Sequence, residues 1–343
     1  MTKNRTATLK EHFNNNRGEE LRPILTSLNG DNSWLYSFPR PASERKISGK
    51  SFFHLVHDPW LNGPTYAGAT WIINITLPEP ANVTNGAGVE KVVEEIEIAA
   101  AEAKGTPYHG PEPGHSAIDA ILLNLHGPDH LHEPTLRTFN PSIPIFASPT
   151  PANEIKAWKY FKTVVTTKDI VPGDGNWNAL HPGAPLPDWL TIFRMCGPMY
   201  LHLSTAIIIS NPDTPDKHEA IIFTPHGIAA DYPSIHTLLH ETSPKFETLA
   251  MLHGLKESSS MGWKNTYGVE YGLKLHREAK PKYWVPSHNA ALRYGGLISY
   301  TIYEAMRTLE WGLENQEDHP DGKLKRDDIN MVTVPNGEIV VLS

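Results

Sequence analysis

Three histidines and one aspartate lie within seven residues in the segment HGPDHLH, residues 126–132. This segment follows an apolar stretch, residues 117–124, that has the pattern of a buried strand. Ligands of α/β proteins usually bind at strand ends, and imidazole together with carboxylate suits zinc, iron or manganese. The alternative is a polar surface loop whose histidines face water. Because the cluster follows a buried strand, its position favours a site over that alternative.

Two further strand-like stretches also lead to a histidine. Residues 218–223 precede His226, and residues 283–286 precede His288. A single histidine after a strand is more often a hydrogen-bonded structural residue than a ligand. If the strands share one edge of a sheet, however, the histidines at their ends converge. Their agreement with the first cluster therefore favours a common site.

The elements that would position these residues alternate along the chain. Helices are predicted at residues 89–104, 154–164, 267–280 and 298–313 from apolar residues at helical spacing. Strands are predicted at residues 24–37 (with a turn), 51–57, 67–77, 117–124, 200–210, 218–223, 246–255, 283–286 and 338–342. We expect a polar leader at 1–22 and one α/β domain at 23–343, in which a boundary near residue 185 would only divide two similar halves of the same domain.

Four motifs carry a resemblance to a known family. The turn Asp58-Pro59-Trp60 resembles an "IDPW" turn, and residues 119–123 (DAILL) resemble a "DAILLSH" strand. Residues 222–227 lie where the family has "YFSGD", and residues 280–288 resemble "PKYVIPMH". The motifs occur in the family's order between about residues 24 and 300. The chain thus resembles the metallo-β-lactamase-fold superfamily, in its lactonase-like branch, and this resemblance implies an αββα sandwich.

The family's metal motif is altered in this chain. The family uses His-x-His-x-Asp-His, and when Asp129-His130 is aligned with its last two residues, Leu125 and Gly127 stand at the first two histidine positions. His226 stands where the family has an aspartate that bridges two metals. For the family's middle ligand, His181 and His202 are candidates by order alone.

A single metal ion (zinc, iron or manganese) held by some of the strand-end residues is therefore the expected cofactor, and a site without metal stays open. The candidate ligands are His126, Asp129, His130, His226 and His288. The resemblance implies that Asp129 holds or deprotonates the attacking water. We assign catalysis to Asp129, His130 and His226.

Substrate binding is predicted for Trp60, Trp177 and His181. The last two belong to a long loop, residues 176–182, in a region that varies among proteins of this fold, where it would form a lid. Burial in the core is the alternative for any tryptophan.

Composition excludes several partners. The net charge is -8 and the 30 lysines and arginines are scattered, so we expect no nucleic acid. No run of eighteen apolar residues occurs, so we expect no membrane span, and the polar N-terminus predicts a cytosolic protein. The sequence leaves the oligomeric state open.

Three functions follow from these residues. The first is a metal-dependent hydrolase of a lactone, an ester or a similar small carbonyl compound. The second is a metal-free enzyme whose histidines catalyse elimination, cyclisation or isomerisation in secondary metabolism. The third is an inactive binding protein on the same fold. Metal content separates the first from the other two.

Overall fold

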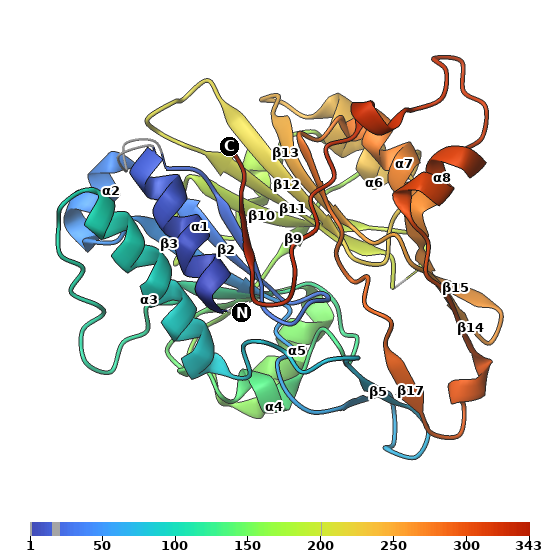
Figure 1. The fold of residues 1–343 in the computed structure, drawn as a ribbon, viewed down its shortest axis with the longest axis horizontal. Coiled ribbons are helices and arrows are strands. Elements are labelled where there is room, and N and C mark those ends of the chain that lie inside the picture. Colours follow the sequence, from blue (N-terminus) through green and yellow to red (C-terminus); the bar gives the residue numbers. More distant parts are fainter. Residues whose placement is uncertain (1, 16–20, 200) are drawn as a thin grey trace.

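Two β-sheets packed face to face form the centre of the molecule, and helices cover both outer faces (Figure 1). The computed structural model describes residues 2–15, 21–199 and 201–343. This arrangement is the αββα sandwich that the sequence predicts.

The first sheet holds seven strands, and its order is β19-β1-β2-β3-β6-β7-β8. Their bounds are β1 Ile24–Ser27, β2 Trp34–Pro39, β3 Phe52–His57, β6 Ala120–Leu123, β7 Ile145–Ala147, β8 Val164–Thr166 and β19 Ile339–Val341. β3 and β6 are parallel, with His57 opposite Leu122, while β2 runs antiparallel to β3. The loops after β3 and β6 and the turn between β1 and β2 therefore meet at one edge of this sheet.

The second sheet holds six strands in the order β16-β13-β12-β11-β10-β9. Their bounds are β9 Lys168–Asp169, β10 Leu190–Cys196, β11 Leu203–Ser210, β12 His218–Thr224, β13 Glu247–His253 and β16 Tyr283–Val285. β12, β13 and β16 are parallel neighbours. The carboxyl ends of these three strands thus lie together, as the sequence analysis requires for its histidines to converge.

Three apolar layers hold the sandwich together. The middle layer lies between the sheets and includes Trp34 and Tyr36 from the first and Ile221 and Leu252 from the second. The outer layers lie under α1 (Thr2–Asn15) and α3 (Gly86–Ala103) on one side, and under α7 (Gly268–Ala279) and α8 (Leu309–Asn315) on the other. The remaining short helices are α2 Ala42–Ser48, α4 Glu133–Leu136, α5 Pro149–Trp158, α6 Pro233–His236, η1 Trp177–Leu180, η2 Thr237–Glu241, η3 Ser299–Thr301 and η4 Arg326–Asp328.

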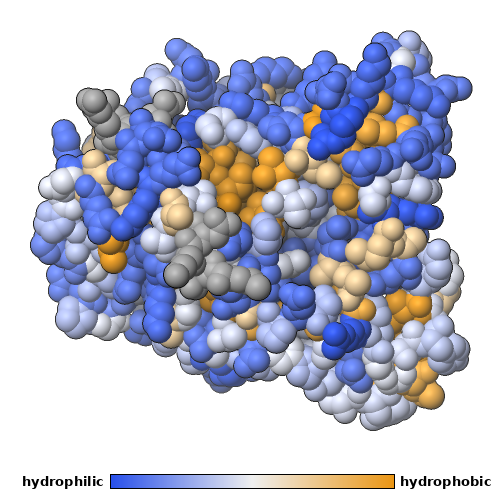
Figure 2. Space-filling model, viewed as in Figure 1, coloured by the Kyte–Doolittle hydropathy of each residue, from blue (hydrophilic) through white to orange (hydrophobic). Residues whose placement is uncertain are grey.

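Two small sheets project from one end of the sandwich, at the lower right of Figure 1. One has the order β17-β5-β4 and the other β15-β14-β18. Their bounds are β4 Thr65–Tyr66, β5 Asn74–Thr76, β14 Glu257–Ser260, β15 Trp263–Tyr267, β17 Arg293–Gly295 and β18 Ile302–Ala305. Figure 2 shows this projecting lobe as mostly pale with small orange areas, whereas the rest of the same face mixes deep blue with larger orange areas.

The structure confirms the long helices predicted at 89–104 and 267–280, which are α3 and α7. The helix predicted at 298–313 is wrong over its first half. Residues 302–305 form β18 instead, because they pair with all of β14, and the helix α8 begins only at Leu309. Tertiary strand pairing here overrides a helical spacing of apolar residues. The helix predicted at 154–164 begins earlier, at Pro149, and ends at Trp158.

The predicted polar leader includes α1, which packs against α3. Leu9 and Phe13 are buried in the layer beneath it, and Arg5 forms an ion pair with Glu95 at 2.8 Å. Part of the leader, residues 16–20, lies outside the described residues. Among the helices that the structure describes, none is long and apolar enough to cross a membrane.

Candidate metal centre

Three buried histidines meet where the two sheets end. His130 follows β6, His226 follows β12, and His288 follows β16. Each offers one ring nitrogen, and these nitrogens all lie within 4.8 Å of one another. The strand-end convergence expected from the sequence is therefore present.

The outer nitrogen of each ring is held by a hydrogen-bond acceptor. Nδ1 of His130 lies 2.7 Å from Asp58 Oδ2, Nδ1 of His288 lies 2.8 Å from Asp31 Oδ2, and Nδ1 of His226 lies 3.1 Å from the Asn265 carbonyl oxygen. Because carboxylate and carbonyl oxygens only accept, each Nδ1 carries the proton and donates it. The lone pair of each Nε2 is then directed toward the shared centre.

Asp129 adds a carboxylate to this centre. Its Oδ2 lies 3.6 Å from Nε2 of His288 and 3.9 Å from Nε2 of His130. The Nε2 atoms of His130 and His226 are 3.1 Å apart. Two lone pairs at that distance repel each other unless a proton or a metal ion lies between them. The donor set of three imidazoles and one carboxylate therefore fits a divalent zinc, iron or manganese ion.

The backbone supporting the centre is strained at two positions. Asp58 and His288 have φ values of 44° and 55°, in the left-handed region that non-glycine residues rarely adopt. Asp58 is fixed there by a hydrogen bond that its Oδ1 accepts from the backbone N–H of Asn124. Such strain is concentrated at functional sites, where the surrounding contacts hold it in place.

The pKa values of His130 and His226 are shifted in opposite directions by their surroundings. Burial would lower the pKa of His130, but the carboxylates of Asp129, Asp58 and Asp31 outweigh it and raise that pKa to about 9. Burial and the two neighbouring imidazoles hold the pKa of His226 well below its ordinary value. Without a metal ion, His130 is therefore the proton donor and His226 the acceptor across their 3.1 Å contact.

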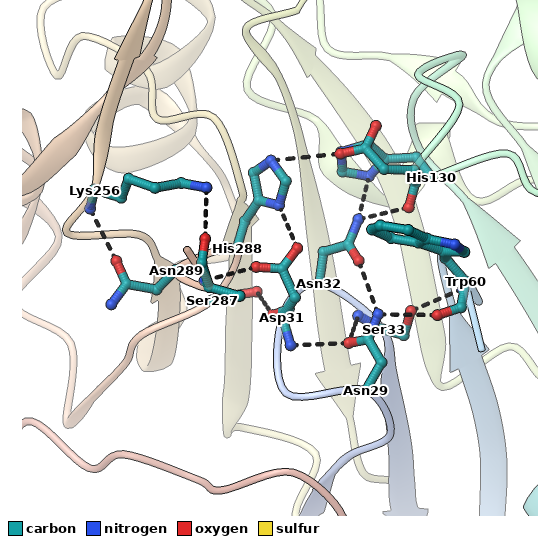
Figure 3. A network of polar contacts seen from close by, with 12 residues as sticks. Asn29, Asp31, Asn32, Ser33, Trp60, His130, Lys256, Ser287, His288 and Asn289 are labelled. Carbon is teal, nitrogen blue, oxygen red and sulfur yellow. Dashed lines mark hydrogen bonds and ion pairs between the residues drawn. The ribbon is translucent and has the colours of Figure 1, made fainter. Parts of the chain in front are cut away.

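A buried cation lies behind His288. The Lys256 ammonium forms an ion pair with Glu304 at 2.8 Å, and the hydroxyl of Tyr294 donates to the same carboxylate oxygen at 2.6 Å. Burial would raise the pKa of Asp31, but His288 and Lys256 lower it to about 2. Figure 3 shows His288 between Asp31 and the side of His130, with Lys256 beyond the Asp31 turn. This network keeps Asp31 ionised and so fixes the orientation of His288.

Of the predicted metal ligands, the structure brings together Asp129, His130, His226 and His288 and places His126 elsewhere. The ring of His126 is half-buried and forms a short hydrogen bond with Glu154 on α5. His132, in the same loop, accepts the hydrogen bond that caps the N-terminus of α4. Both histidines therefore have structural hydrogen bonds, and neither is a ligand of the centre; His132 is buried, so the alternative of a loop whose histidines face water does not hold for it either.

The altered family motif has a steric reason. A Cβ atom at Gly127 would lie 3.0 Å from Asp129 Oδ1 and 3.1 Å from His130 Cδ2. A histidine at this position, as the family pattern has it, would therefore need the loop to shift. Of the candidates for the family's middle ligand, His202 stacks on Tyr267 and His181 binds a carbonyl oxygen, and both lie outside the described group of converging nitrogens.

The predicted substrate residues do not line this centre. Trp60 is fully buried, and its indole N–H donates to the Gly63 carbonyl. Its backbone accepts a hydrogen bond from Asn29 and donates one to Ser33, so it supports the turn that carries Asp31 (Figure 3). Trp177 is also buried and packs on His218, the first residue of β12. A strand of seven residues spans roughly 20 Å, so Trp177 lies at the end of the sheet opposite His226.

His181 lies at that same opposite end. Its Nε2 contacts the Pro187 carbonyl oxygen at 3.2 Å, just before β10 begins. β10 begins opposite Ile209, which in turn faces Glu219 near the start of β12. The loop predicted as a lid, residues 176–182, therefore lies at the end of the second sheet opposite the metal centre. The sequence alone does not show at which end of the strands this loop lies.

Sequence analysis also missed the residues that orient the histidines. Asp58 enters it only as part of a turn that resembles the family's, and Asp31 only as a residue of the turn expected within residues 24–37. A usable signal existed for Asp58, which directly follows the buried strand β3. No pattern marks the carbonyl of Asn265, since any residue supplies one.

A cavity of about 290 Å³ lies between the start of α5 and the end of β10, and none of the four candidate ligands lines it. It is lined by His126, Ser148 and Leu203, among others. The carbonyl of Leu203 accepts a hydrogen bond from Asn124, whose backbone N–H binds Asp58. Hydrogen bonds through Asn124 and Asp58 thus link the cavity wall at Leu203 to His130.

No protein-family model and no curated protein matches this chain. Solved structures do match it. A "possible metal-dependent hydrolase" from Veillonella parvula has a TM-score of 0.53 and 9% identity, over 94% of this chain and 100% of that one. An isothiocyanate hydrolase from Delia radicum gut bacteria has a TM-score of 0.50 and 14% identity, over 93% and 99%.

A metallo-β-lactamase-fold protein from Bacillus subtilis also matches, with a TM-score of 0.46 and 10% identity over 93% of this chain and 99% of that one. At such identities the first two matches establish the fold and leave the reaction open. The chain therefore has the αββα fold of these hydrolases, which is the metallo-β-lactamase fold that its sequence motifs indicate.

Proposed function

We propose that this protein is a hydrolase that uses one divalent metal ion to cleave a lactone, an ester or a similar small carbonyl compound. The observation that carries the proposal is the convergence of ring nitrogens from three buried histidines within 4.8 Å, with Asp129 Oδ2 at 3.6 and 3.9 Å from two of them. His130, His226, His288 and Asp129 would hold the ion. When bound, such an ion polarises a carbonyl group and lowers the pKa of water from about 15.7 towards about 7.

The protein's own groups then have separate tasks. Asp129 directs one carboxylate oxygen, Oδ2, toward His288 and His130, so this carboxylate is placed to accept the proton of the attacking water. Asp58 and Asp31 keep the proton on Nδ1 of His130 and His288, so that Nε2 stays free.

The neighbouring cavity suits a small substrate. Its volume of about 290 Å³ is at the lower limit for ligand pockets, which span roughly 300–1,000 Å³. Its lining combines the half-buried imidazole of His126 and polar groups of Ser148, Thr150 and Arg194 with apolar atoms, among them those of Pro151, Met199 and Leu203. A compact ester or lactone with a short side chain fits these properties.

Acid–base chemistry by the histidines alone is the second candidate. It is favoured by the opposite pKa shifts of His130 and His226 at a separation of 3.1 Å. A protonated donor beside a neutral acceptor would serve elimination or isomerisation, with a contribution of roughly 100- to 10,000-fold in rate.

Activity measurements separate the two candidates. A panel of small lactones, aryl esters and thioesters is assayed with the protein as purified, after removal of metal with a chelator, and after addition of Zn²⁺, Fe²⁺ or Mn²⁺. We expect hydrolysis that disappears with the chelator and returns with one of the ions. Catalysis that survives chelation would contradict the metal-dependent mechanism and support the second candidate.

A further inference from the structure

Five large side chains at the end of the projecting lobe are strongly exposed. Trp71, Met261, Trp263, Leu297 and Tyr300 each keep between 63% and 83% of their accessible surface. We refer to these five residues as the aromatic tip. Exposed apolar residues are ordinary when they are scattered, but a contiguous group marks an interaction surface.

Backbone hydrogen bonds tie the aromatic tip into one surface. The N–H of Leu297 donates to the carbonyl of Trp71 at 2.8 Å, which joins the turn before β5 to the segment after β17. The N–H of Met261 donates to the carbonyl of Thr301 at 3.4 Å, which joins the β14–β15 turn to the same segment. The tip is therefore contributed by three separate parts of the chain that lie together.

The exposed area is large enough for a stable interface. Large side chains of this kind bury about 150–250 Å² each, so the tip offers on the order of 650 Å² at its observed exposure. The largest apolar patch on a typical monomer is about 300–600 Å². A standard interface needs about 800 Å² from each partner. The tip alone offers less, and Tyr303 and Met306, which are 62% and 49% exposed on and just after β18, add to it.

Charge selects the partner. Residues 69–73, 258–263 and 296–303, which form the tip, contain no charged side chain, although the whole chain carries a net charge of -8. Two copies of an acidic protein repel each other least where both surfaces are uncharged. Anionic membranes instead attract clusters of lysine and arginine, which these segments lack. The pale lobe in Figure 2 has this character.

We infer that the aromatic tip is the interface of a two-fold symmetric homodimer. The same patch on each chain packs against its copy, as symmetric dimers require. The lobe is also bonded to the candidate metal centre, through the Asn265 carbonyl on β15 to His226 and through Glu304 on β18 to Lys256. Dimerisation thus holds in place the two strands that support the centre, whichever reaction takes place there.

The first test is the mass of the protein in solution. Light scattering and sedimentation between about 1 and 100 µM should give twice the chain mass of 38.2 kDa. The double variant Trp263→Ser with Tyr300→Ser should weaken dimerisation at least about 100-fold, since buried aromatic anchors dominate such interfaces. The matched control, Ile47→Ser with Val171→Ser, removes exposed apolar side chains outside the lobe and should remain a dimer.

A cross-link locates the interface. In a Cys196→Ser background, Tyr300→Cys should give an oxidised dimer on a non-reducing gel, and Ile47→Cys should not. The inference is overturned by a single-chain mass at every concentration, or by a dimer that the double tip variant leaves unchanged. A monomer that sediments with phosphatidylcholine vesicles would overturn it in favour of a lipid surface.

Discussion

The two large sheets contribute different kinds of side chain to the candidate metal centre. The first sheet and its loops supply every carboxylate, namely Asp31, Asp58 and Asp129, together with His130. The second sheet supplies the imidazoles of His226 and His288. Carboxylates outweigh the burial of His130 and raise its pKa, whereas burial and the neighbouring imidazoles lower the pKa of His226. The comparison teaches that two imidazoles in contact differ in pKa because of the charges that surround each ring.

Removing one ligand that either sheet contributes should have the largest effect. Asp129→Asn on the side of the first sheet and His288→Asn on the side of the second should each lower the hydrolytic rate by roughly 100- to 10,000-fold, because each removes a direct ligand or base. Both variants should also lose bound metal. If only one of the two variants lost activity, the account of a shared centre would be wrong.

Disturbing an orienting residue should have a smaller effect. Asp58→Asn keeps the shape and tolerates the positive φ, but its amide no longer fixes the proton on Nδ1 of His130. We expect metal affinity to fall about 10- to 100-fold, measured by competition with a chromophoric chelator. Asp213→Asn, the same change at a carboxylate that binds only the backbone N–H of Ala42, is the control and should change nothing.

Acid should destabilise the fold through buried neutral histidines on both sheets. Burial lowers the pKa of His57 on β3 and of His253 on β13 to about 4, from 6.5 in the unfolded chain. Between these values the unfolded state binds more protons, so stability falls as the pH drops from about 6.5 to about 4. At pH 5 the loss should be about 2 kcal/mol per histidine. Urea midpoints at pH 7.5 and 5 measure it, and His253→Gln should reduce the difference.

The smallest effect is expected at His126, four residues from His130 but outside the centre. His126→Ala should leave metal content unchanged and raise KM by less than about tenfold, equivalent to about 1.4 kcal/mol, because the ring lines only the neighbouring cavity. Loss of metal in this variant would instead make His126 a ligand after movement of its loop. Steady-state kinetics beside metal analysis separates the two results.

Sequence patterns could predict the residues whose position follows from strand direction. His226 and His288 follow β12 and β16, two parallel strands with β13 between them, so their convergence needs only the strand order. His126 and His130 share one loop, and which of them turns inward depends on the close approach at Gly127, which sequence does not encode locally. Asp31 reaches His288 across 257 residues of chain, and that pairing depends on how the two sheets stack.

The prediction of helices and strands is limited in the same way by contacts between distant segments. Helices with a long apolar stripe, such as α3 and α7, were predictable because one face must be buried. β18 was not, because its pairing with β14 comes from a segment more than forty residues earlier. The exposure of the aromatic tip could not be predicted either, because the sequence does not distinguish a tryptophan in the core from one on the surface.

The most direct test of the central claim is the metal stoichiometry of the purified protein. The protein is incubated with Zn²⁺, Fe²⁺ or Mn²⁺, desalted and analysed for metal, beside His130→Ala and His288→Ala with their folding checked by circular dichroism. The account predicts about one tightly held ion per chain, lost in both variants. Two ions per chain, or none with the fold intact, would contradict it.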